Sequence, residues 1–293
     1  MALCAAGRPL QNTRNALGRF FKQSSAFSSN TSNPQEEEIR QKLQQFSGGS
    51  IDLQKQESGI AVMTVNNPAL MNAFSGSMMI ELEERVSELE TWTEGKGLIV
   101  KGSAGTFCSG SDLNAVRATS KPEDGMKMCM FMQKTLTRLL RWVYVMFFFF
   151  YCFFFFLLLM TSDAVIQFVH KHMGLVPGWG GAARLVQIVG SQNALQLLAG
   201  AKKVDPQLGR QIGLVDEVLS LSLASENSLM EAEKWLSQFT KGSAPVIRAV
   251  KKVVVSGREL PLEEALRTEK DIFGTVWGGP ANLEALARKT KHK

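Results

Sequence analysis

The alternation of apolar and polar residues predicts a strand, a helix and a second strand in the first half of the chain. Residues 59–65 are a β-rich run, which ends at an Asn-Asn-Pro turn. Between residues 75 and 90 the apolar positions recur at spacings of three and four, which indicates an amphipathic helix. The apolar run at 97–101 is short enough to be a strand buried on both faces. Because strand, helix and strand follow in that order, we expect an α/β unit with a right-handed crossover.

The second half of the pattern is nearly all helical. One helix fits residues 125–141, where apolar residues again return every three or four positions. We therefore expect a core over residues 38–200, followed by a helical C-terminal region over residues 201–293, and we find no internal repeat. Beyond Gly181 the candidate helices, which are separated by Gly, Ser or Pro, are 182–189, 193–198, 226–239, 246–254 and 262–273.

The first 37 residues differ in composition from the rest of the chain. Basic residues occur there among Ser, Thr and Asn, and no acidic residue precedes Glu36. This composition is typical of a mitochondrial transit peptide, but a disordered basic tail would share it. Both alternatives stay open, and we expect ordered structure to begin near Ile51.

Composition and charge exclude several classes of protein. With 45% hydrophobic and 20% charged residues among 293, the chain has the composition of a globular protein with a large core. The net charge of +6 comes from basic residues spread along the chain, without the aromatic-interleaved stripe of nucleic-acid-binding proteins, so no nucleic-acid partner is expected. The four cysteines form no C-x-x-C pair, which favours a reduced intracellular protein.

Several short motifs occur in a fixed order along the chain. They are Asn-Pro-Ala-Leu-Met-Asn-Ala at 67–73, Gly-Leu-Ile-Val-Lys-Gly at 97–102, Thr-Phe-Cys-Ser-Gly-Ser-Asp-Leu at 106–113, Met-Gly-Leu-Val-Pro-Gly-Trp-Gly-Gly at 173–181 with Arg-Leu at 184–185, and Gly-Leu-Val-Asp-Glu-Val at 213–218. Together they resemble the motifs of the crotonase (enoyl-CoA hydratase/isomerase) superfamily, over about residues 38–141 and 159–289. The resemblance implies an α/β fold with a crotonase-like core of repeated ββα units. It also implies a helical C-terminal region that mediates trimerisation, and hence a homotrimer or hexamer.

Two further blocks point to one subgroup of this family. Trp-Thr-Glu-Gly-Lys-Gly at 92–97 and Thr-Val-Trp-Gly-Gly-Pro-Ala-Asn-Leu-Glu at 275–284 resemble its decarboxylases. The resemblance implies decarboxylation of ethylmalonyl-CoA through an oxyanion-stabilised thioester enolate, as metabolite proofreading, with methylmalonyl-CoA as an open second substrate. The acyl-CoA substrate carries the CoA, so no cofactor or metal is implied. The family's decarboxylase is cytosolic, which favours the cytosol over the mitochondrion that the N-terminal composition suggests, and no membrane partner is expected.

The motif at 106–113 is where the resemblance places an oxyanion donor. Enzymes of this family stabilise a thioester enolate with two backbone N–H groups, and preorganised donors need no reorganisation as charge develops. The N–H of Ser111 is the expected first donor, and its side chain is not needed. Taken alone, the motif could equally be a tight surface turn, and Trp179 a core residue. The expected substrate-binding residues are Phe107, Ser109, Gly110, Asp112, Leu113, Pro177, Trp179 and Gly180.

The pair of glutamates that hydratases of the family use for acid–base chemistry is missing from the expected positions. Hydratases of the family use two glutamates, but a gap-free alignment puts His170 at the second position, and the segment with the first has no counterpart. A chain without this carboxylate pair is poorly equipped to add water to an enoyl thioester. His170 could donate a proton or position the leaving carboxylate, or be a surface histidine with neither role. A metal pair with His172 lacks a third ligand, so no metal site is expected.

Residues 142–158 depart from the family pattern. They include eight phenylalanines, and no glycine occurs between Gly125 and Gly174. The strand, the Gly-rich loop with the second oxyanion donor and the helix start of the family are therefore expected to be missing. The run could be a membrane span, a variant strand that overpacks the core, or the tail of an intron read as protein. We favour the last, because Phe, Leu, Tyr and Cys share pyrimidine-rich codons.

Three hypotheses for function follow from these features. The first is an acyl-CoA carboxy-lyase whose activity is reduced because the second oxyanion loop is missing. The second is a catalytically impaired homologue that still binds CoA thioesters and oligomerises. The third is a membrane-anchored protein, if the apolar run at 142–158 spans a bilayer.

Overall fold

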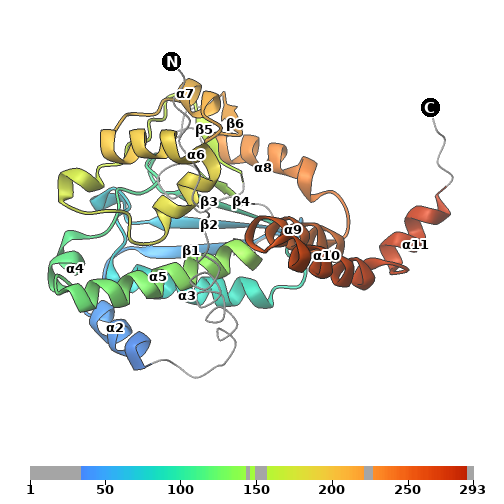
Figure 1. Cartoon of the computed structure of the whole chain (residues 1–293), viewed down its shortest axis with the longest axis horizontal. Helices are drawn as coiled ribbons and strands as arrows, with labels where there is room; N and C mark the ends of the chain where they lie inside the picture. Colours follow the sequence, from blue (N-terminus) through green and yellow to red (C-terminus); the bar gives the residue numbers. More distant parts are fainter. Residues whose placement is uncertain (1–33, 143–145, 149–156, 221–226, 289–293) are drawn as a thin grey trace, which may run out of the picture.

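The computed structural model describes residues 34–142, 146–148, 157–220 and 227–288, with the backbone alone at 142 and at 146–148. A four-stranded sheet lies in the middle of the molecule, between helices on one side and a small second sheet with further helices on the other (Figure 1). The last helices extend away from this body (Figure 1). The mixed α/β architecture with C-terminal helices confirms the predicted fold class.

The central sheet has the strand order β1-β2-β3-β4. Strand β1 (Ser50–Lys55) is antiparallel to β2 (Ile60–Asn66), and β3 (Gly97–Gly102) is parallel to β2. Helix α3 (Gly76–Thr91) connects the two parallel strands. The predicted strand–helix–strand unit is thus confirmed, with each element within one residue of its expected bounds.

Strand β4 (Met146–Phe148) continues the sheet beyond β3. It is parallel to β3, with Leu98 opposite Met146. The expectation that residues 142–158 have lost the family's strand is therefore wrong. Strand pairing uses backbone groups, and aromatic residues favour extended structure, so this strand needs no glycine. Residues 149–156, where the Gly-rich loop would follow, lie outside the described residues.

Both faces of the parallel strands are buried, as their apolar runs predicted. Successive side chains of a strand point to opposite faces, so each strand supplies both cores. On the side of α3 the buried residues are Ala61, Met63, Val65, Leu98 and Val100. On the opposite side they are Ile60, Val62 and Ile99.

Helices α3 and α5 (Pro122–Trp142) cover one face of the sheet. Helix α3 begins after Ser75, whose Oγ accepts a hydrogen bond from the Met78 N–H at 3.2 Å as an N-cap. The predicted apolar spacing of both helices is confirmed, because it forms the buried stripe. The stripe consists of Met78, Met79, Leu82, Val86, Leu89, Phe131, Met132, Leu136, Leu139 and Leu140.

Helix α2 (Pro34–Gln44) precedes the sheet and was not predicted. It buries Ile39 and Leu43 completely in the core formed with α3 and α5. Ordered structure therefore begins before Ile51, contrary to expectation, and the expected boundary at residue 38 falls inside this helix. Charged residues fill most other positions of α2, so its two apolar anchors give no clear period.

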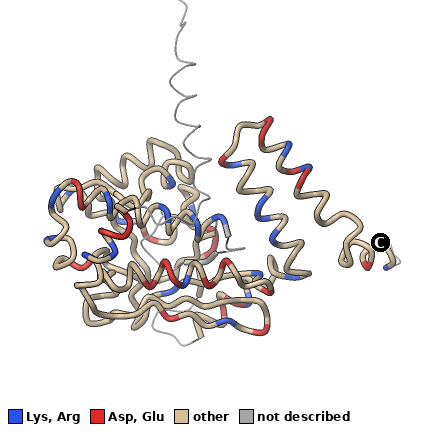
Figure 2. The backbone as a smooth tube through the Cα atoms, turned by 90° about the horizontal axis from the view of Figure 1, so that it is seen from below, with Lys and Arg blue, Asp and Glu red and all other residues tan. Residues whose placement is uncertain are grey.

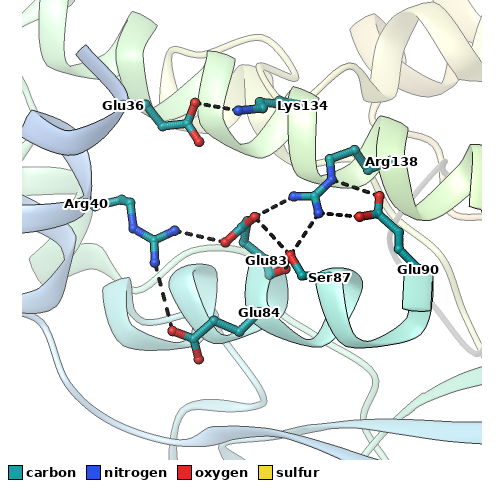
Figure 3. A network of polar contacts seen from close by, with 8 residues as sticks. All are labelled: Glu36, Arg40, Glu83, Glu84, Ser87, Glu90, Lys134 and Arg138. Carbon is teal, nitrogen blue, oxygen red and sulfur yellow. Dashed lines mark hydrogen bonds and ion pairs between the residues drawn. The ribbon is translucent and has the colours of Figure 1, made fainter. Parts of the chain in front are cut away.

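A network of ion pairs joins α2 to α3 and α5 (Figure 3). Arg138 of α5 contacts Glu90 of α3 with both ends of its guanidinium, at 2.9 Å from Nε and 2.6 Å from Nη2. The same guanidinium donates to Glu83 of α3. Arg40 of α2 reaches Glu83 from the other side, at 3.0 Å. Glu83 thus links all three helices, and the charged residues of α2 help to anchor it.

The far face of the sheet packs on a second, parallel pair of strands. Strand β5 (Leu159–Thr161) pairs with β6 (Glu217–Leu219). Buried residues of these strands, together with Ala232 and Leu236 of helix α8 (Asn227–Thr240), contact the far side of the central sheet. The predicted helix at 226–239 is thus confirmed as α8.

Helices α6 (Gly181–Gly200) and α7 (Pro206–Gln211) enclose a further apolar core against β5 and β6. Helix α6 unites the predicted helices 182–189 and 193–198 across a kink at Gly190, which has φ 77° and ψ 165°. Only glycine adopts such a backbone conformation readily, so the break in the apolar pattern is a real break in the helix.

The chain ends in three helices that leave the main body (Figures 1 and 2). Helices α9 (Ala244–Glu259) and α10 (Leu262–Val276) lie side by side, and α11 (Pro280–Ala287) follows them. They confirm the predicted helices at 246–254 and 262–273. Basic and acidic residues are interspersed along the whole tube (Figure 2). Of the helices in the described ranges, none combines the length and apolarity that a bilayer span requires.

A glycine-to-alanine change at the α2–α3 contact should destabilise the protein. A Cβ at Gly76 would lie 2.0 Å from the Leu43 carbonyl oxygen, so Gly76→Ala must push the helices apart, at a cost of about 1–3 kcal/mol in the free energy of unfolding. Gly257→Ala is the matched control, since it adds a methyl group to the exposed interior of α9 and should be neutral or stabilise by about 0.5–1 kcal/mol. Urea unfolding of both variants measures the difference, and an equal effect at the two sites would contradict the close contact.

Removing the charge of Glu83 should destabilise the protein in a pH-dependent way. Burial alone would raise the pKa of Glu83, but the hydrogen bonds from Arg138 and Arg40 outweigh it and lower the pKa below its ordinary value. The ionised carboxylate therefore adds stability above its unfolded pKa of about 4.3, and this contribution is lost as the pH falls through the lower folded pKa. Glu83→Gln should cost about 1.5–3 kcal/mol at pH 7, and the difference from wild type should shrink below about pH 4.3.

The matched control for this change is Glu84→Gln. Glu84 is exposed and lies 3.9 Å from Arg40, so its loss should change stability by less than about 1 kcal/mol. Chemical unfolding between pH 7 and pH 4 gives both differences. A Glu83→Gln effect that did not vary with pH would show that packing, and not charge, anchors the three helices.

Candidate active site

The chain turns sharply where β2 ends. A single 3₁₀ turn (Pro68–Leu70) is followed by Met71 and Asn72, which both have left-handed backbones with φ 50° and 57°. Asn67 holds the end of this turn, because its Nδ2 donates to the Ala73 carbonyl at 2.8 Å. The motif at 67–73 is therefore a folded turn beside the expected oxyanion segment.

Phe74 pairs with the oxyanion segment through its backbone. Its N–H donates to the Gly110 carbonyl at 2.8 Å, and its carbonyl accepts from the Asp112 N–H at 2.9 Å, which makes a parallel bridge to Ser111. Because the residues on either side of Ser111 make these bonds, the N–H of Ser111 points away from Phe74. Within the described chain it donates to no other group. The structure thus gives Ser111 the backbone geometry of an outward-facing donor.

Gly110 gives the segment its bend. Its φ of +121° lies outside the range that side-chain-bearing residues adopt, so glycine is required there. The Cys108 thiol lies under the bend, with its Sγ 3.3 Å from the Gly110 N and 3.4 Å from the Gly110 carbonyl oxygen. Burial raises the pKa of Cys108 to about 11, so this thiol stays protonated and is no nucleophile.

A second glycine lets the segment lie close to the sheet. A Cβ at Gly102, at the end of β3, would lie 1.9 Å from the Thr106 carbonyl oxygen and 2.5 Å from the Phe107 Cα. The Phe107 side chain is buried and belongs to the core with α3 and α5, so it anchors the segment and faces away from solvent. Its expected role in binding substrate stays a prediction.

The segment leads directly into a short helix, α4 (Leu113–Ala118). Asp112 caps it, since its carboxylate accepts from the Asn114 N–H at 2.9 Å. Leu113 is 47% exposed at the start of this helix. Ser109 is exposed and makes two bonds to the preceding turn. Asp112 and Ser109 therefore hold the segment in shape, while Leu113 offers an apolar surface next to the Ser111 N–H.

The structure brings Trp179 to the same place. Its ring meets the Phe74 ring edge to face, with centroids 6.0 Å apart and an angle of 86° between the planes. Trp179 is only partly buried at the margin of the core, so the alternative of a plain core residue does not describe it fully. Phe74, which the sequence reading left without a role, thus connects the oxyanion segment with the Trp179 loop.

Helix α5 holds the loop that carries Trp179. Gln133 donates from Nε2 to the Gly178 carbonyl at 2.5 Å, and Thr137 accepts from Arg184 at 2.8 Å. Gly180, with φ +86°, is the N-cap of α6, and Pro177 is half-buried just before the tryptophan. Contacts from α5 and the start of α6 therefore fix the loop that carries Pro177, Trp179 and Gly180, whose expected role in binding substrate stays a prediction.

His170 opens a short 3₁₀ helix (His170–Met173). No hydrogen bond joins it to the Ser111 segment in the described ranges. Its half-buried imidazole loses hydration, and this burial lowers its pKa. Among the residues that the structure describes, its buried Nδ1 has no hydrogen-bond partner. In the part of the chain that the structure describes, no set of three or more His, Cys, Asp or Glu side chains could hold a metal.

Asp216, in the motif at 213–218, makes two hydrogen bonds to the residue before β5. Its carboxylate accepts from the Leu158 N–H at 2.6 Å, and its own N–H donates to the Leu158 carbonyl at 2.9 Å. These bonds fix the start of β5, directly after the Phe-rich run. The described structure after the Phe-rich run is therefore fixed directly before residue 159, where the resemblance to the family resumes.

The sequence of this chain matches a known protein family and several named relatives. The enoyl-CoA hydratase/isomerase family matches residues 55–146 and 157–279. A relative from Danio rerio, called ethylmalonyl-CoA decarboxylase, is 62% identical over 97% of both chains. The human protein of the same name is 56% identical, over 87% of this chain and 86% of its own.

Solved structures show the same fold at low sequence identity. The enoyl-CoA hydratase from Thermoplasma volcanium has a TM-score of 0.71 and 22% identity, over 82% of this chain and 97% of that one. The protein DspI of Pseudomonas aeruginosa has a TM-score of 0.72 and 20% identity, over 83% and 96% of the two chains. The Ser111 segment and the Trp179 loop lie within the residues that match the family.

Proposed function

Because the chain belongs to the enoyl-CoA hydratase/isomerase family, we propose that it is an enzyme that decarboxylates ethylmalonyl-CoA to butyryl-CoA and carbon dioxide. Two observations support the proposal. Relatives of that name match nearly the whole chain. The Ser111 N–H faces outward from its bridge with Phe74, where it can meet a thioester oxygen.

The proposed reaction needs little from side chains. The bond between the α-carbon and the free carboxylate breaks, and its electron pair moves into the thioester as an enolate. The Ser111 N–H stabilises the negative charge on the thioester oxygen, and a donor already held in place does so without reorganisation. A proton then reaches the α-carbon, which gives butyryl-CoA. No step requires a metal or an organic cofactor, and the CoA belongs to the substrate.

We propose that His170 either donates the proton to the α-carbon or positions the leaving carboxylate. Its pKa is lowered by burial, so the imidazole is neutral at pH 7, and its Nδ1 has no hydrogen-bond partner. A neutral ring can donate one hydrogen bond to the leaving carboxylate or pass a proton to the α-carbon. The substrate would have to contact both His170 and the Ser111 N–H, since no hydrogen bond joins the two in the described ranges.

The second oxyanion donor of the family would lie within residues 142–158. Of these, the structure describes the backbone of β4 and residues 157 and 158. We propose that catalysis in this chain depends mainly on the Ser111 N–H, and that it is slower than in relatives with a Gly-rich loop. Loss of one such donor typically lowers kcat by about 10²–10³.

Substrate range and location complete the proposal. Methylmalonyl-CoA differs from ethylmalonyl-CoA by one methylene group, which an apolar pocket distinguishes only weakly, by about 10–200-fold. We therefore propose methylmalonyl-CoA as a poorer second substrate, and removal of such wrongly carboxylated thioesters, in the cytosol, as the role of the enzyme.

We also propose that the chain is a homotrimer. The helices that leave the main body expose many large apolar side chains, and exposed apolar patches mark protein interfaces. Trp277, which is 65% exposed, stacks on Phe273 with centroids 5.0 Å apart. The other exposed residues of this surface are Val250, Val254, Leu262, Leu266, Leu283 and Leu286.

Loss of this apolar surface should dissociate the oligomer. The double variant Phe273→Ala, Trp277→Ala removes two exposed aromatic anchors, and hot-spot residues of this type typically contribute about 2 kcal/mol or more each. Lys270→Ala, also exposed on α10, is the matched control and should not change the mass. Sedimentation velocity should give a trimer for wild type and control and a monomer for the double variant. A monomeric wild-type chain would disprove the proposal.

The proposed reaction is tested by two changes at Ser111. Ser111→Ala keeps the backbone N–H and should decarboxylate ethylmalonyl-CoA at the wild-type rate, because the side chain is not needed. Ser111→Pro removes the N–H and should lower kcat by about 10²–10³. Butyryl-CoA formation, followed by chromatography, measures both. Equal activity of the two variants would mean that another group stabilises the enolate.

The same protein should not hydrate crotonyl-CoA, because no glutamate occupies the second catalytic position, where His170 stands. Hydration at a rate typical of the family would contradict the assignment of His170 to that position and would make a hydratase a candidate function again. Binding of butyryl-CoA without any turnover of ethylmalonyl-CoA would instead favour the catalytically impaired homologue, which the Phe-rich run makes the second candidate.

A further inference from the structure

Asn72 is a fully buried polar side chain between two loops of the site. Its Oδ1 accepts hydrogen bonds from the Asn67 N–H and the Ser103 hydroxyl, at 2.8 and 2.9 Å. Its Nδ2 donates to the carbonyls of Ser103 and Thr106, at 2.8 and 2.5 Å. A carboxamide has two donor hydrogens and two acceptor lone pairs, so every hydrogen-bonding position of Asn72 is used. It joins the turn after β2 to the loop after β3.

The turn that Asn72 secures holds the oxyanion segment at two points. Ser109 donates from its N–H to the Met71 carbonyl at 2.9 Å and from its hydroxyl to the Leu70 carbonyl at 3.1 Å. Phe74, two residues after Asn72, makes the parallel bridge to Ser111 described above. Ser111 lies between these points, so a displacement of the turn would rotate its N–H.

Local backbone preference does not maintain this turn. Met71 and Asn72 are consecutive residues in the left-handed region, which is uncommon for residues other than glycine. Asparagine tolerates that conformation better than most residues, and methionine does not. The tertiary hydrogen bonds of Asn72 must therefore hold the turn, and their loss would also leave the Ser103 and Thr106 carbonyls without this donor.

We propose that Asn72 is a positioning residue, which directs the Ser111 N–H by locking the turn at 67–74 onto the loop at 103–106. Asn72 does not touch the substrate, and it acts through the Ser109 and Phe74 hydrogen bonds. The inference rests on the proposed function, because the group that is positioned is the proposed oxyanion donor.

The test compares the binding of butyryl-CoA with that of its thioether analogue, which lacks the carbonyl oxygen. Wild type should prefer the thioester, because only the thioester can accept the Ser111 hydrogen bond. Asn72→Asp keeps the size but replaces the donor by oxygen, and Asn72→Gly removes the amide while tolerating the left-handed backbone. Both should lower the preference roughly fivefold, as for the loss of one hydrogen bond, with unchanged affinity for the thioether. The infrared shift of the bound thioester carbonyl should shrink in parallel.

Two further variants separate positioning from general stability. Asn193→Ala is the matched control, since it removes a partly buried amide whose Nδ2 donates to the Val189 carbonyl at 2.9 Å, away from the site. It should leave the carbonyl shift unchanged. Ser103→Ala removes one of the four hydrogen bonds of Asn72 and should reduce the shift by less than Asn72→Gly. This milder change keeps the test decisive if the Asn72 variants do not fold.

The outcomes distinguish this inference from the proposed function. A full carbonyl shift in folded Asn72→Asp, or in Ser103→Ala if Asn72 variants do not fold, would overturn the role of Asn72 and leave the function standing. Equal binding of thioester and thioether by wild type would overturn the proposed oxyanion contact, and the inference with it. A shift that shrinks at Asn72 and Ser103, but not at Asn193, supports the role of Asn72.

Discussion

Two backbone hydrogen bonds between Phe74 and the chain at Gly110 and Asp112 are the constraint on which the candidate site depends. They join the ends of two parallel strands by a route outside the sheet. Among the described residues, they leave the N–H of Ser111 without an internal partner. The Phe74 ring, on the same residue, meets Trp179. A single residue thus sets both the direction of the donor and the position of the loop opposite. The glycines at 102 and 110 matter because they permit this approach.

Helix α5 carries the elements on either side of the site. One side of it binds α3 through Arg138 and α2 through Lys134 (Figure 3). Another side holds the Trp179 loop through Gln133 and Thr137. Helix α2 lies before the part of the chain that matches the family, and yet it packs on the start of α3, next to Phe74. The segment therefore belongs to the folded core, and its charged residues act as tertiary contacts.

Much of the fold could be predicted from the sequence, because β2, α3, β3 and the long helices have regular apolar periods. Helix α2 could not, since ion pairs replace apolar contacts on most of its surface. The prediction that the family's strand is missing from residues 142–158 was wrong, because the lack of glycine was taken as a sign of its loss. Strand β4 forms by backbone pairing with β3, which needs no glycine. In the site, the motifs pointed to the Ser111 segment and the Trp179 loop, which the structure joins through the ring contact of Phe74 and Trp179, and their roles stay predictions. The roles of Asn72 and Phe74 depend on contacts between distant loops, which no local pattern reveals.

The burial of the Cys108 thiol beneath the bend at Gly110 has a consequence for its reactivity. Oxidants and alkylating agents react with the thiolate form of cysteine, and with a pKa of about 11 only about one Cys108 side chain in ten thousand is ionised at pH 7. The Sγ is also shielded from solvent by the bend it supports. The donor segment thus contains a sulfur atom that is buried and protonated at pH 7, so reagents that attack thiolates should leave this segment unmodified.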